Sequence, residues 1–210
     1  MKKINVLLVD DEDLLRQGLR SLLEKEIFVN SISEAGNSED FHRMLSAQSF
    51  DIILLDIKMP GSKGNELLES INAFPIRPKV IAVTGLDGVE LTINLLKLGI
   101  NGIVYKLDGY TEIVKTIQEV LKTGSYFHDR TLRIIQHNAN RWDKVPSIAL
   151  NFQEAAMIKA LATGLTTKAM AMELNLTEAT AETYRIRLIK KTGAPNTAAL
   201  LAYAYRNGML

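Results

Sequence analysis

The first 124 residues alternate between short apolar runs and amphipathic stretches, which is the pattern of a parallel sheet with crossover helices. The clearest apolar run, residues 52–55, is typical of a strand that is covered on both faces. We predict strands over residues 4–9, 28–33, 50–55, 80–83 and 102–105, and helices over 13–25, 38–47, 64–73, 89–98 and 110–122. Asp13 and Ser38 are the expected N-caps of the first two helices. Five β-α units predict right-handed crossovers and helices on both faces of the sheet.

The alternation stops after residue 124. Residues 129–137 are expected to form a short helix, and the polar stretch 138–147, with Pro146, predicts a linker. The rest of the chain shows no strand pattern and predicts four short helices, over 152–162, 167–174, 178–191 and 197–207. We therefore predict an α/β domain of flavodoxin-like (βα)5 topology over 1–124, a linker over 125–148 and an all-α domain over 149–210.

Composition narrows the classes of function. The absence of cysteine excludes a disulfide framework, thiol catalysis and thiolate metal sites, and the three histidines show no zinc-ligand spacing. The net charge of +1 hides an asymmetry, because residues 1–124 carry 14 Lys+Arg against 18 Asp+Glu, whereas residues 149–210 carry 7 against 4. The basic second part is compatible with a nucleic-acid partner. No segment has the apolar length of a membrane span, and acidic residues follow the first apolar run too soon for a signal peptide, so we expect a cytoplasmic protein without a membrane partner.

Charged and hydroxyl side chains stand where the predicted strands end. Asp10 and Asp11 follow the first strand, Asp56 the third and Lys106 the fifth, and Thr84 ends the fourth. Because the carboxyl ends of parallel strands share one edge of a sheet, these residues are expected to converge. Three neighbouring carboxylates repel one another and favour a divalent cation, for which Mg²⁺ is the natural choice. With the lysine and the threonine hydroxyl, such a site could hold a phosphoryl group in transfer to Asp56.

Each of these residues alone has an ordinary interpretation as a helix cap, a strand end or a surface charge, and only their conjunction favours a site. The motifs VDDE at 9–12, DIKMPG at 56–61, VTG at 83–85 and GIVYK at 102–106 resemble the receiver domain of bacterial two-component response regulators, over about residues 3–124. The resemblance implies that Asp56 accepts a phosphoryl group from a sensor histidine kinase. It also implies that Asp10, Asp11, Asp56 and the main-chain carbonyl of Lys58 bind Mg²⁺, that Thr84 bonds the phosphoryl oxygen and that Lys106 pairs with it.

The sequence departs from the receiver pattern at one position. Many receivers carry an aromatic switch residue three positions before the lysine, where this chain has Ile103, while Tyr105 adjoins Lys106. Phosphorylation can still favour a second state through Thr84. The Lys58 side chain occupies a variable family position, and we hypothesise that its charge alters the lifetime of the phosphoryl group.

The second part of the chain contains two predicted helices joined by a tight connection at residues 175–177, an arrangement that inserts its second helix into the DNA major groove. The outer side of that second helix presents basic residues suited to phosphates beside a threonine and an isoleucine suited to base edges. An amphipathic helix with solvated charges is the competing interpretation. The candidate DNA contacts, including two at the start of the first helix, are Thr166, Lys168, Glu182, Thr183, Ile186, Arg187 and Lys190.

The stretch GLTTKAMAMELNLTEATAETYRIRLIKKTGA, at 164–194, resembles the LuxR-type helix-turn-helix of the NarL/FixJ class of response regulators, over about residues 150–210. The resemblance implies a sequence-specific transcription regulator that binds double-stranded promoter DNA and forms a homodimer when phosphorylated or bound to DNA. In that family the last helix often pairs the DNA-binding domains. Its candidates here are Leu200, Leu201, Tyr203 and Ala204, which are alternatively ordinary core.

We interpret the chain as a phosphorylation-controlled, DNA-binding regulator and not as an enzyme, apart from its own phosphorylation and dephosphorylation. An aspartyl-phosphate hydrolase is disfavoured because Lys58 stands where such enzymes carry a second acid. A nucleotide-dependent oxidoreductase is disfavoured because acidic residues occupy the turn of a glycine-rich loop. A receiver-containing adaptor or DNA-binding protein that acts without phosphorylation stays open, because Ile103 replaces the aromatic switch residue.

Overall fold

A computed structural model of the chain describes residues 3–59, 62–72, 74, 77–85, 88–142, 150–207 and 209–210. Internal contacts divide the chain into two compact units, which are described separately below. The first unit comprises Met1–Asp87 and Gly102–Ile117, and the second comprises Gly88–Asn101 and Gln118–Leu210. Among the helices within the described ranges, none has both the length and the apolar character that crossing a lipid bilayer requires.

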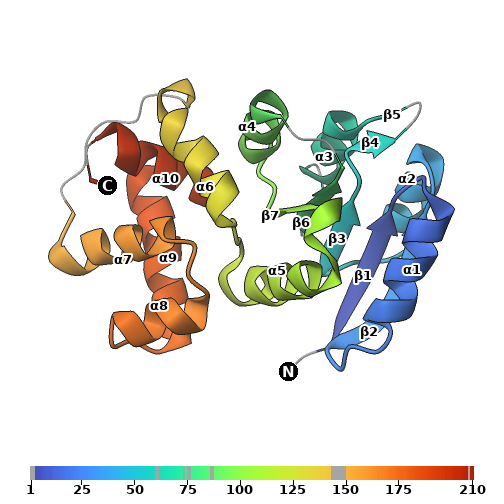
Figure 1. Cartoon of the computed structure of the whole chain (residues 1–210), viewed down its shortest axis with the longest axis horizontal. Coiled ribbons are helices and arrows are strands. Elements are labelled where there is room, and N and C mark those ends of the chain that lie inside the picture. The colour runs from blue at the N-terminus through green and yellow to red at the C-terminus, as the bar shows by residue number, and fades with distance from the viewer. Residues whose placement is uncertain are drawn as a thin grey trace. The chain divides into compact units, whose positions relative to one another are not determined.

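The first unit contains a five-stranded parallel sheet (Figure 1). Its strand order is β2-β1-β3-β6-β7, and the central strands β1 and β3 pair from Val6↔Ile52 to Val9↔Leu55. The chain turns outward from β1 to β2 and then crosses back to β3, so the strand order reverses between β1 and β3. Open α/β sheets bind ligands outside the carboxyl ends of the strands at such a reversal. The strands are β1 Ile4–Val9, β2 Val29–Ala35, β3 Ile52–Leu55, β6 Lys79–Thr84 and β7 Gly102–Tyr105.

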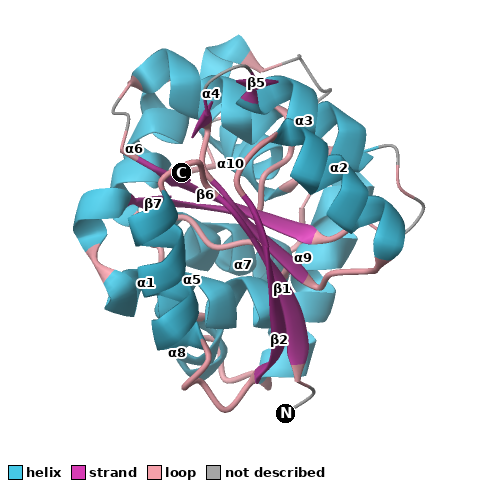
Figure 2. Ribbon diagram, turned by 90° about the vertical axis from the view of Figure 1, so that its right-hand side faces the viewer, coloured by secondary structure: helices cyan, strands magenta, loops and turns pink. Residues whose placement is uncertain are grey.

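Helices cover both faces of this sheet, with α1 and the start of α5 on one face and α2 and α3 on the other (Figure 2). Strands β1, β3, β6 and β7 are buried along almost their whole length, as the apolar runs predict, and Ile52 to Leu55 are at most 2% exposed. The edge strand β2 is exposed at Asn30 and Ser31. The helices are α1 Asp13–Leu23, α2 Ser38–Ala47, α3 Gly64–Asn72 and α5 Tyr110–Thr123. The sequence pattern missed a hairpin of β4 Lys58–Met59 and β5 Ser62–Lys63, and a 3-10 turn, η1 Lys106–Asp108. Pro60 and Gly61, the last two residues of the DIKMPG motif, lie outside the described residues.

Both predicted N-caps are wrong by one residue. Glu12 precedes α1 and makes no capping hydrogen bond with its side chain, while Asp13 is already helical. Asn37 rather than Ser38 caps α2, because its extended backbone lets the side-chain oxygen accept a hydrogen bond from the Asp40 amide at 2.8 Å. Asn and Ser are comparable capping residues, so the choice between neighbours depends on backbone geometry.

The second unit is helical in its described part, and it includes the four helices predicted at the C-terminal end. Within the stretch predicted as a linker, residues 139–141 form a 3-10 turn, and residues 143–147, with Pro146, lie outside the described residues. The elements are α4 Val89–Lys97, the end of α5, α6 Asp129–His137, η2 Ala139–Arg141, α7 Phe152–Ala162, α8 Thr167–Glu173, α9 Glu178–Thr192 and α10 Thr197–Arg206.

Helix α10 forms the centre of this second unit. All eight residues from Thr197 to Ala204 are buried, and α10 packs against α6, η2, α7 and α9. Arg185 on α9 is itself buried and donates a hydrogen bond to the Thr197 hydroxyl at 3.0 Å, which joins α9 to the start of α10. The four residues considered for pairing between DNA-binding domains are therefore core residues in this structure: Leu200, Leu201, Tyr203 and Ala204.

Candidate functional site

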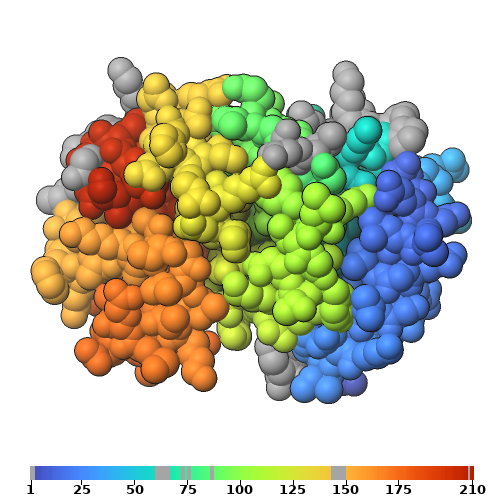
Figure 3. Space-filling view, viewed as in Figure 1, coloured from blue at the N-terminus to red at the C-terminus, as the bar shows by residue number. Residues whose placement is uncertain are grey.

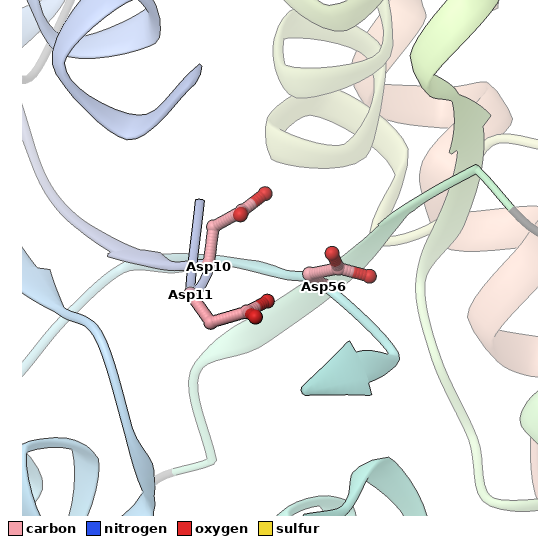
Figure 4. Close-up of side chains that lie close together, drawn as sticks. All are labelled: Asp10, Asp11 and Asp56. Carbon is pink, nitrogen blue, oxygen red and sulfur yellow. The ribbon is translucent and has the colours of Figure 1, made fainter. Parts of the chain in front are cut away.

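The strand ends of the first unit bring Asp10 and Asp56 together. Asp10 follows β1 and Asp56 follows β3, and the Asp56 amide donates to the Val9 carbonyl at 2.7 Å, which extends the β1–β3 ladder to the site. Asp10, Asp11 and Asp56 each offer a carboxylate oxygen within 4.8 Å of the others, and Figure 4 shows the three carboxylates grouped together. Asp10 and Asp56 are each 4% exposed. The three carboxylates predicted to converge therefore lie together in the structure.

Two carboxylates of the cluster are oriented by main-chain amides. The Glu12 amide donates to Asp10 Oδ1 at 2.8 Å, and the Lys58 amide donates to Asp56 Oδ1 at 2.9 Å. Each donor lies two residues after its aspartate, so the local turn at the strand end holds the acceptor in place. The second oxygen of each carboxylate points to Lys106.

Lys106 follows β7 and reaches across the sheet edge to the acidic cluster. Its ammonium nitrogen lies 2.8 Å from Asp56 Oδ2, 3.0 Å from Asp10 Oδ2 and 3.1 Å from Glu12 Oε2. The contact with Glu12 was not predicted from the sequence. The acidic residue that closes the VDDE motif was the only signal, and an exposed glutamate there has many other orientations.

The acidic cluster carries more negative than positive charge. Three carboxylates and one ammonium leave two negative charges, with the exposed Glu12 as a further acid at the rim. Burial raises the pKa of Asp10, and this effect outweighs the hydrogen bond from the Glu12 amide and the charge of the Lys106 ammonium, which both lower that pKa. Burial lowers the pKa of Lys106, but hydrogen bonds to Asp56, Asp10 and Glu12 outweigh it and raise that pKa. The lysine is therefore charged at neutral pH, and the surplus is one that a divalent cation neutralises.

A cavity of about 530 Å³ opens above the cluster. Lys58 at its rim is exposed, whereas Asp56 at its floor is buried, so a small anion that enters meets a carboxylate held beside a cation. This arrangement suits nucleophilic attack by Asp56 on an incoming electrophile with charge stabilisation by Lys106. The lining residues are Asp11, Glu12, Asp56, Lys58, Met59, Gly85 and Lys106.

Thr84 and Ile103 lie on the adjacent strands β6 and β7. Thr84 is 2% exposed and is the register partner of Tyr105, while Ile103 pairs with Ala82. Ile103 is 4% and Tyr105 is 8% exposed. The side chain next to Thr84 on the neighbouring strand is thus the aromatic Tyr105, although the position three before Lys106 is aliphatic.

The second unit contains the predicted pair of helices, α8 and α9. Asn175 in the connection adopts a left-handed backbone conformation with φ of 53°, which turns the chain sharply between the helices. Thr177 caps α9 by accepting a hydrogen bond from the Thr180 amide at 3.1 Å. Thr166 caps α8, accepting from the Ala169 amide at 3.3 Å, and Lys168 is exposed in its first turn.

The outer face of α9 presents most of the predicted DNA contacts. Ile186 is 54% exposed, although it is a large apolar residue, and the Arg187 guanidinium lies 5.4 Å from the centre of the Tyr184 ring. Glu182 differs from the others, because its carboxylate binds the buried Arg185 guanidinium, with one contact of 2.9 Å. The exposed members of the predicted set on this helix are Thr183, Ile186, Arg187 and Lys190.

Comparison with known proteins agrees with both parts of this description. Residues 6–118 match the family model described as the response regulator receiver domain, and residues 149–204 match the bacterial regulatory proteins, luxR family. A putative transcriptional regulator of Pseudomonas aeruginosa is 28% identical and covers 98% of this chain and 99% of its own length. The response regulator UvrY of Escherichia coli is 27% identical, with 98% of this chain and 95% of that protein covered.

Solved structures of response regulators also resemble this one. The response regulator RcsB in complex with DNA has a TM-score of 0.61 to this structure, with 25% identity, 96% of this chain and 98% of that chain covered. RcsB of Salmonella typhimurium gives a TM-score of 0.60, also with 25% identity, and covers 97% of this chain. The receiver domain, which carries the acidic cluster at its sheet edge, is followed by a luxR-family helix-turn-helix. This chain therefore belongs to the two-component response regulators of the NarL/FixJ class.

Proposed function

We propose that Asp56 is the phosphoacceptor of this regulator and that a sensor histidine kinase supplies the phosphoryl group. The supporting observation is the environment of Asp56: a nearly buried carboxylate with one oxygen fixed by the Lys58 amide and the other 2.8 Å from Lys106. Attack on phosphorus forms an Asp56–phosphoryl bond and releases the donor's leaving group. Lys106 then stabilises the negative charge on the transferred oxygens, and we assign to Thr84 the hydrogen bond that reports their presence.

We assign Mg²⁺ to the acidic cluster as the cofactor of this transfer. The donor set fits the ion, because Mg²⁺ prefers oxygen ligands and keeps several waters, and the cavity beside the three carboxylates is open to solvent. Asp10, Asp11, Asp56 and the main-chain carbonyl of Lys58 are the proposed ligands. When bound, Mg²⁺ draws electron density from the phosphoryl oxygens and offsets the two surplus negative charges.

Labelling by acetyl phosphate tests the Asp56 assignment. With Mg²⁺ present, the wild-type chain should form an acid-stable, hydroxylamine-sensitive phosphoryl adduct, and Asp56→Asn should abolish it. Asp51→Asn is the matched control, because Asp51 precedes the same strand at its opposite end. Undiminished labelling of Asp56→Asn would refute the assignment.

We propose that the regulator binds promoter DNA through α9 in the major groove, as a homodimer, in the cytoplasm where that DNA lies. The exposed Arg187 and Lys190 supply phosphate contacts, and Thr183 and Ile186 face base edges. Thr166 and Lys168 add contacts at the start of α8. Because Glu182 binds Arg185 on the same helix, its proposed contribution is to position that guanidinium for its hydrogen bond to Thr197, and its partly exposed carboxylate is the proposed contact to a base.

The salt dependence of binding tests this assignment. Lys190→Ala should weaken binding to all promoter fragments alike and reduce the slope of log K against log salt by about 0.9, the value of one phosphate contact. Lys159→Ala, an exposed lysine on α7, should leave the slope unchanged. If beryllofluoride and Mg²⁺ leave the affinity of the wild-type chain for promoter fragments unchanged, the regulator acts without phosphorylation and the proposed coupling is wrong.

A further inference from the structure

Arg16 on α1 lies beside the acidic cluster without belonging to it. Figure 3 shows that α1, in blue, is at the surface of its unit, where arginine side chains are ordinarily solvated. The Arg16 side chain is nevertheless only 13% exposed, whereas that of Arg20, one turn further along the same helix, is 46% exposed. A guanidinium that is mostly shielded from water needs hydrogen-bond acceptors from the protein in place of water.

Three elements of the first unit supply those acceptors. Arg16 Nη1 donates to the main-chain carbonyl of Asp10, directly after β1, at 2.6 Å, and Nε donates to Glu34 Oε2 on β2 at 3.0 Å. Nη2 binds the Asp13 carboxylate in the first turn of α1. Gly36 leaves room for the guanidinium, since a Cβ atom there would stand 3.2 Å from Nη1. The planar set of donors therefore joins the ends of β1 and β2 to α1.

The bond from Arg16 completes the set of contacts that fix Asp10. The Asp10 amide donates to the Ala35 carbonyl at 3.2 Å, and its two carboxylate oxygens bind the Glu12 amide and the Lys106 ammonium. Its carbonyl stands beyond the last register pair of β1 and β2, and Arg16 donates to it there. Every polar group of Asp10 thus has a partner, on the main chain as well as on the side chain.

The orientation of this carbonyl also determines where Asp11 points. The peptide group between Asp10 and Asp11 is planar, so fixing its oxygen fixes the bond that leads to the Asp11 α-carbon. From that position the Asp11 carboxylate comes within 4.8 Å of those of Asp10 and Asp56. We propose that Arg16 is a positioning residue for the Mg²⁺ site, because its hydrogen bond to the Asp10 carbonyl holds the Asp10–Asp11 peptide so that both carboxylates face the cation. This inference rests on the Mg²⁺ site of the proposed function.

The charge of Arg16 and its position have opposite effects on metal binding. A positive charge near a cation site repels the cation, so its removal should, by charge alone, tighten Mg²⁺ binding. Removal of a group that orients metal ligands instead weakens metal binding, typically by about 10–100-fold. Because Arg16 contacts the main chain of a proposed ligand, we expect the loss of orientation to outweigh the loss of repulsion. The sign of the change in Mg²⁺ affinity therefore separates the two roles.

Calorimetric titration of the full-length chain with MgCl₂ tests the proposal, with the folded fraction of each variant measured by circular dichroism. Arg16→Met should raise the Mg²⁺ dissociation constant about tenfold or more. Arg20→Met is the matched control, because it removes the same charge from the same helix and from the same partner, Glu34, which Arg20 contacts at 2.6 Å. Arg20 binds Glu24 with its other donor, so Arg20→Met should leave the dissociation constant unchanged or slightly lower.

Arg16→Lys provides a second variant if the methionine variant does not fold. It keeps the charge, but one ammonium cannot reach three acceptors that lie in three directions, so this variant should also bind Mg²⁺ more weakly than the wild type. Wild-type or tighter binding by the Arg16 variants would overturn the proposal, and so would an equal loss in Arg20→Met, which would trace to Glu34. If Asp11→Asn binds Mg²⁺ as tightly as the wild type, the proposed metal site is wrong and this inference fails with it.

Discussion

Replacing Lys106 by methionine should destabilise the metal-free first unit and make its stability depend on Mg²⁺. Methionine keeps an apolar stem of similar length and removes the positive charge that contacts Asp56 at 2.8 Å and Asp10 at 3.0 Å. The variant leaves three carboxylates within 4.8 Å of one another with no compensating ammonium. The charge of the cluster then changes from two negative charges to three.

The size of the effect follows from the distances and the burial. Opposite charges about 4 Å apart at an effective dielectric constant of about 20 interact with about 4 kcal/mol, and losing one partner of a buried pair costs about 3–5 kcal/mol. The Lys106 side chain is 16% exposed, so water screens part of this interaction. We expect a loss of about 3 kcal/mol in the free energy of unfolding at pH 8, and a smaller loss at lower pH, where Asp10, whose pKa burial raises, takes up a proton.

Mg²⁺ should restore more stability to the variant than to the wild-type chain. A ligand at 100 times its dissociation constant stabilises the folded state by about 2.7 kcal/mol, and a site with one more negative charge binds the cation more tightly. Urea unfolding with and without MgCl₂ measures both quantities. It should be followed by far-UV circular dichroism, because the single tryptophan, Trp142, belongs to the second unit. Lys58→Met, at an exposed lysine on the same cavity, should change stability by less than about 0.5 kcal/mol. A metal-free Lys106→Met protein as stable as the wild type would show that Lys106 does not neutralise the cluster.

Three further predictions concern individual residues. Glu154 is 4% exposed and bonds Lys191 at 2.6 Å, and this bond lowers the pKa of Glu154. Glu154→Gln should therefore lower the free energy of unfolding by about 1–2 kcal/mol at pH 7. The loss should shrink as pH falls through the folded-state pKa, which lies below the ordinary 4.5, and urea titration followed by fluorescence measures it. Burial raises the pKa of Asp10, so its ionised form lowers the stability of the folded state at neutral pH. Asp10→Asn should therefore raise the urea midpoint of the metal-free chain, and it should weaken Mg²⁺ binding measured by calorimetry. An unchanged Mg²⁺ affinity would show that Asp10 is not a ligand. Gly193 ends α9 with φ of 67°, so Gly193→Ala should lower stability by about 1 kcal/mol in thermal melts despite the open space around it, and an unchanged melting temperature would contradict this.

The pattern along the chain determined the fold class and the members of the acidic site. Asp10, Asp56 and Lys106 could be predicted to meet because each directly follows an apolar strand, and parallel strands end at one edge whatever their separation in sequence. The helix-turn-helix pair was predictable for a similar reason, since its turn and caps are local features of the chain. Such features depend on residues that are close together in the sequence, so they can be predicted from the sequence alone.

Only the tertiary structure decided which side chains the folded chain covers and where long side chains point. Helical periodicity marks Leu14 and Leu201 alike as apolar, yet Leu14 is 86% exposed and Leu201 is 1% exposed, because burial depends on which other elements pack over a face. The contact of Glu12 with Lys106 joins residues 94 apart through flexible side chains, and no pattern along the chain encodes their rotamers. The meeting of the acidic residues with Lys106 could therefore be predicted from the sequence, whereas the exposure of apolar side chains on α1 could not.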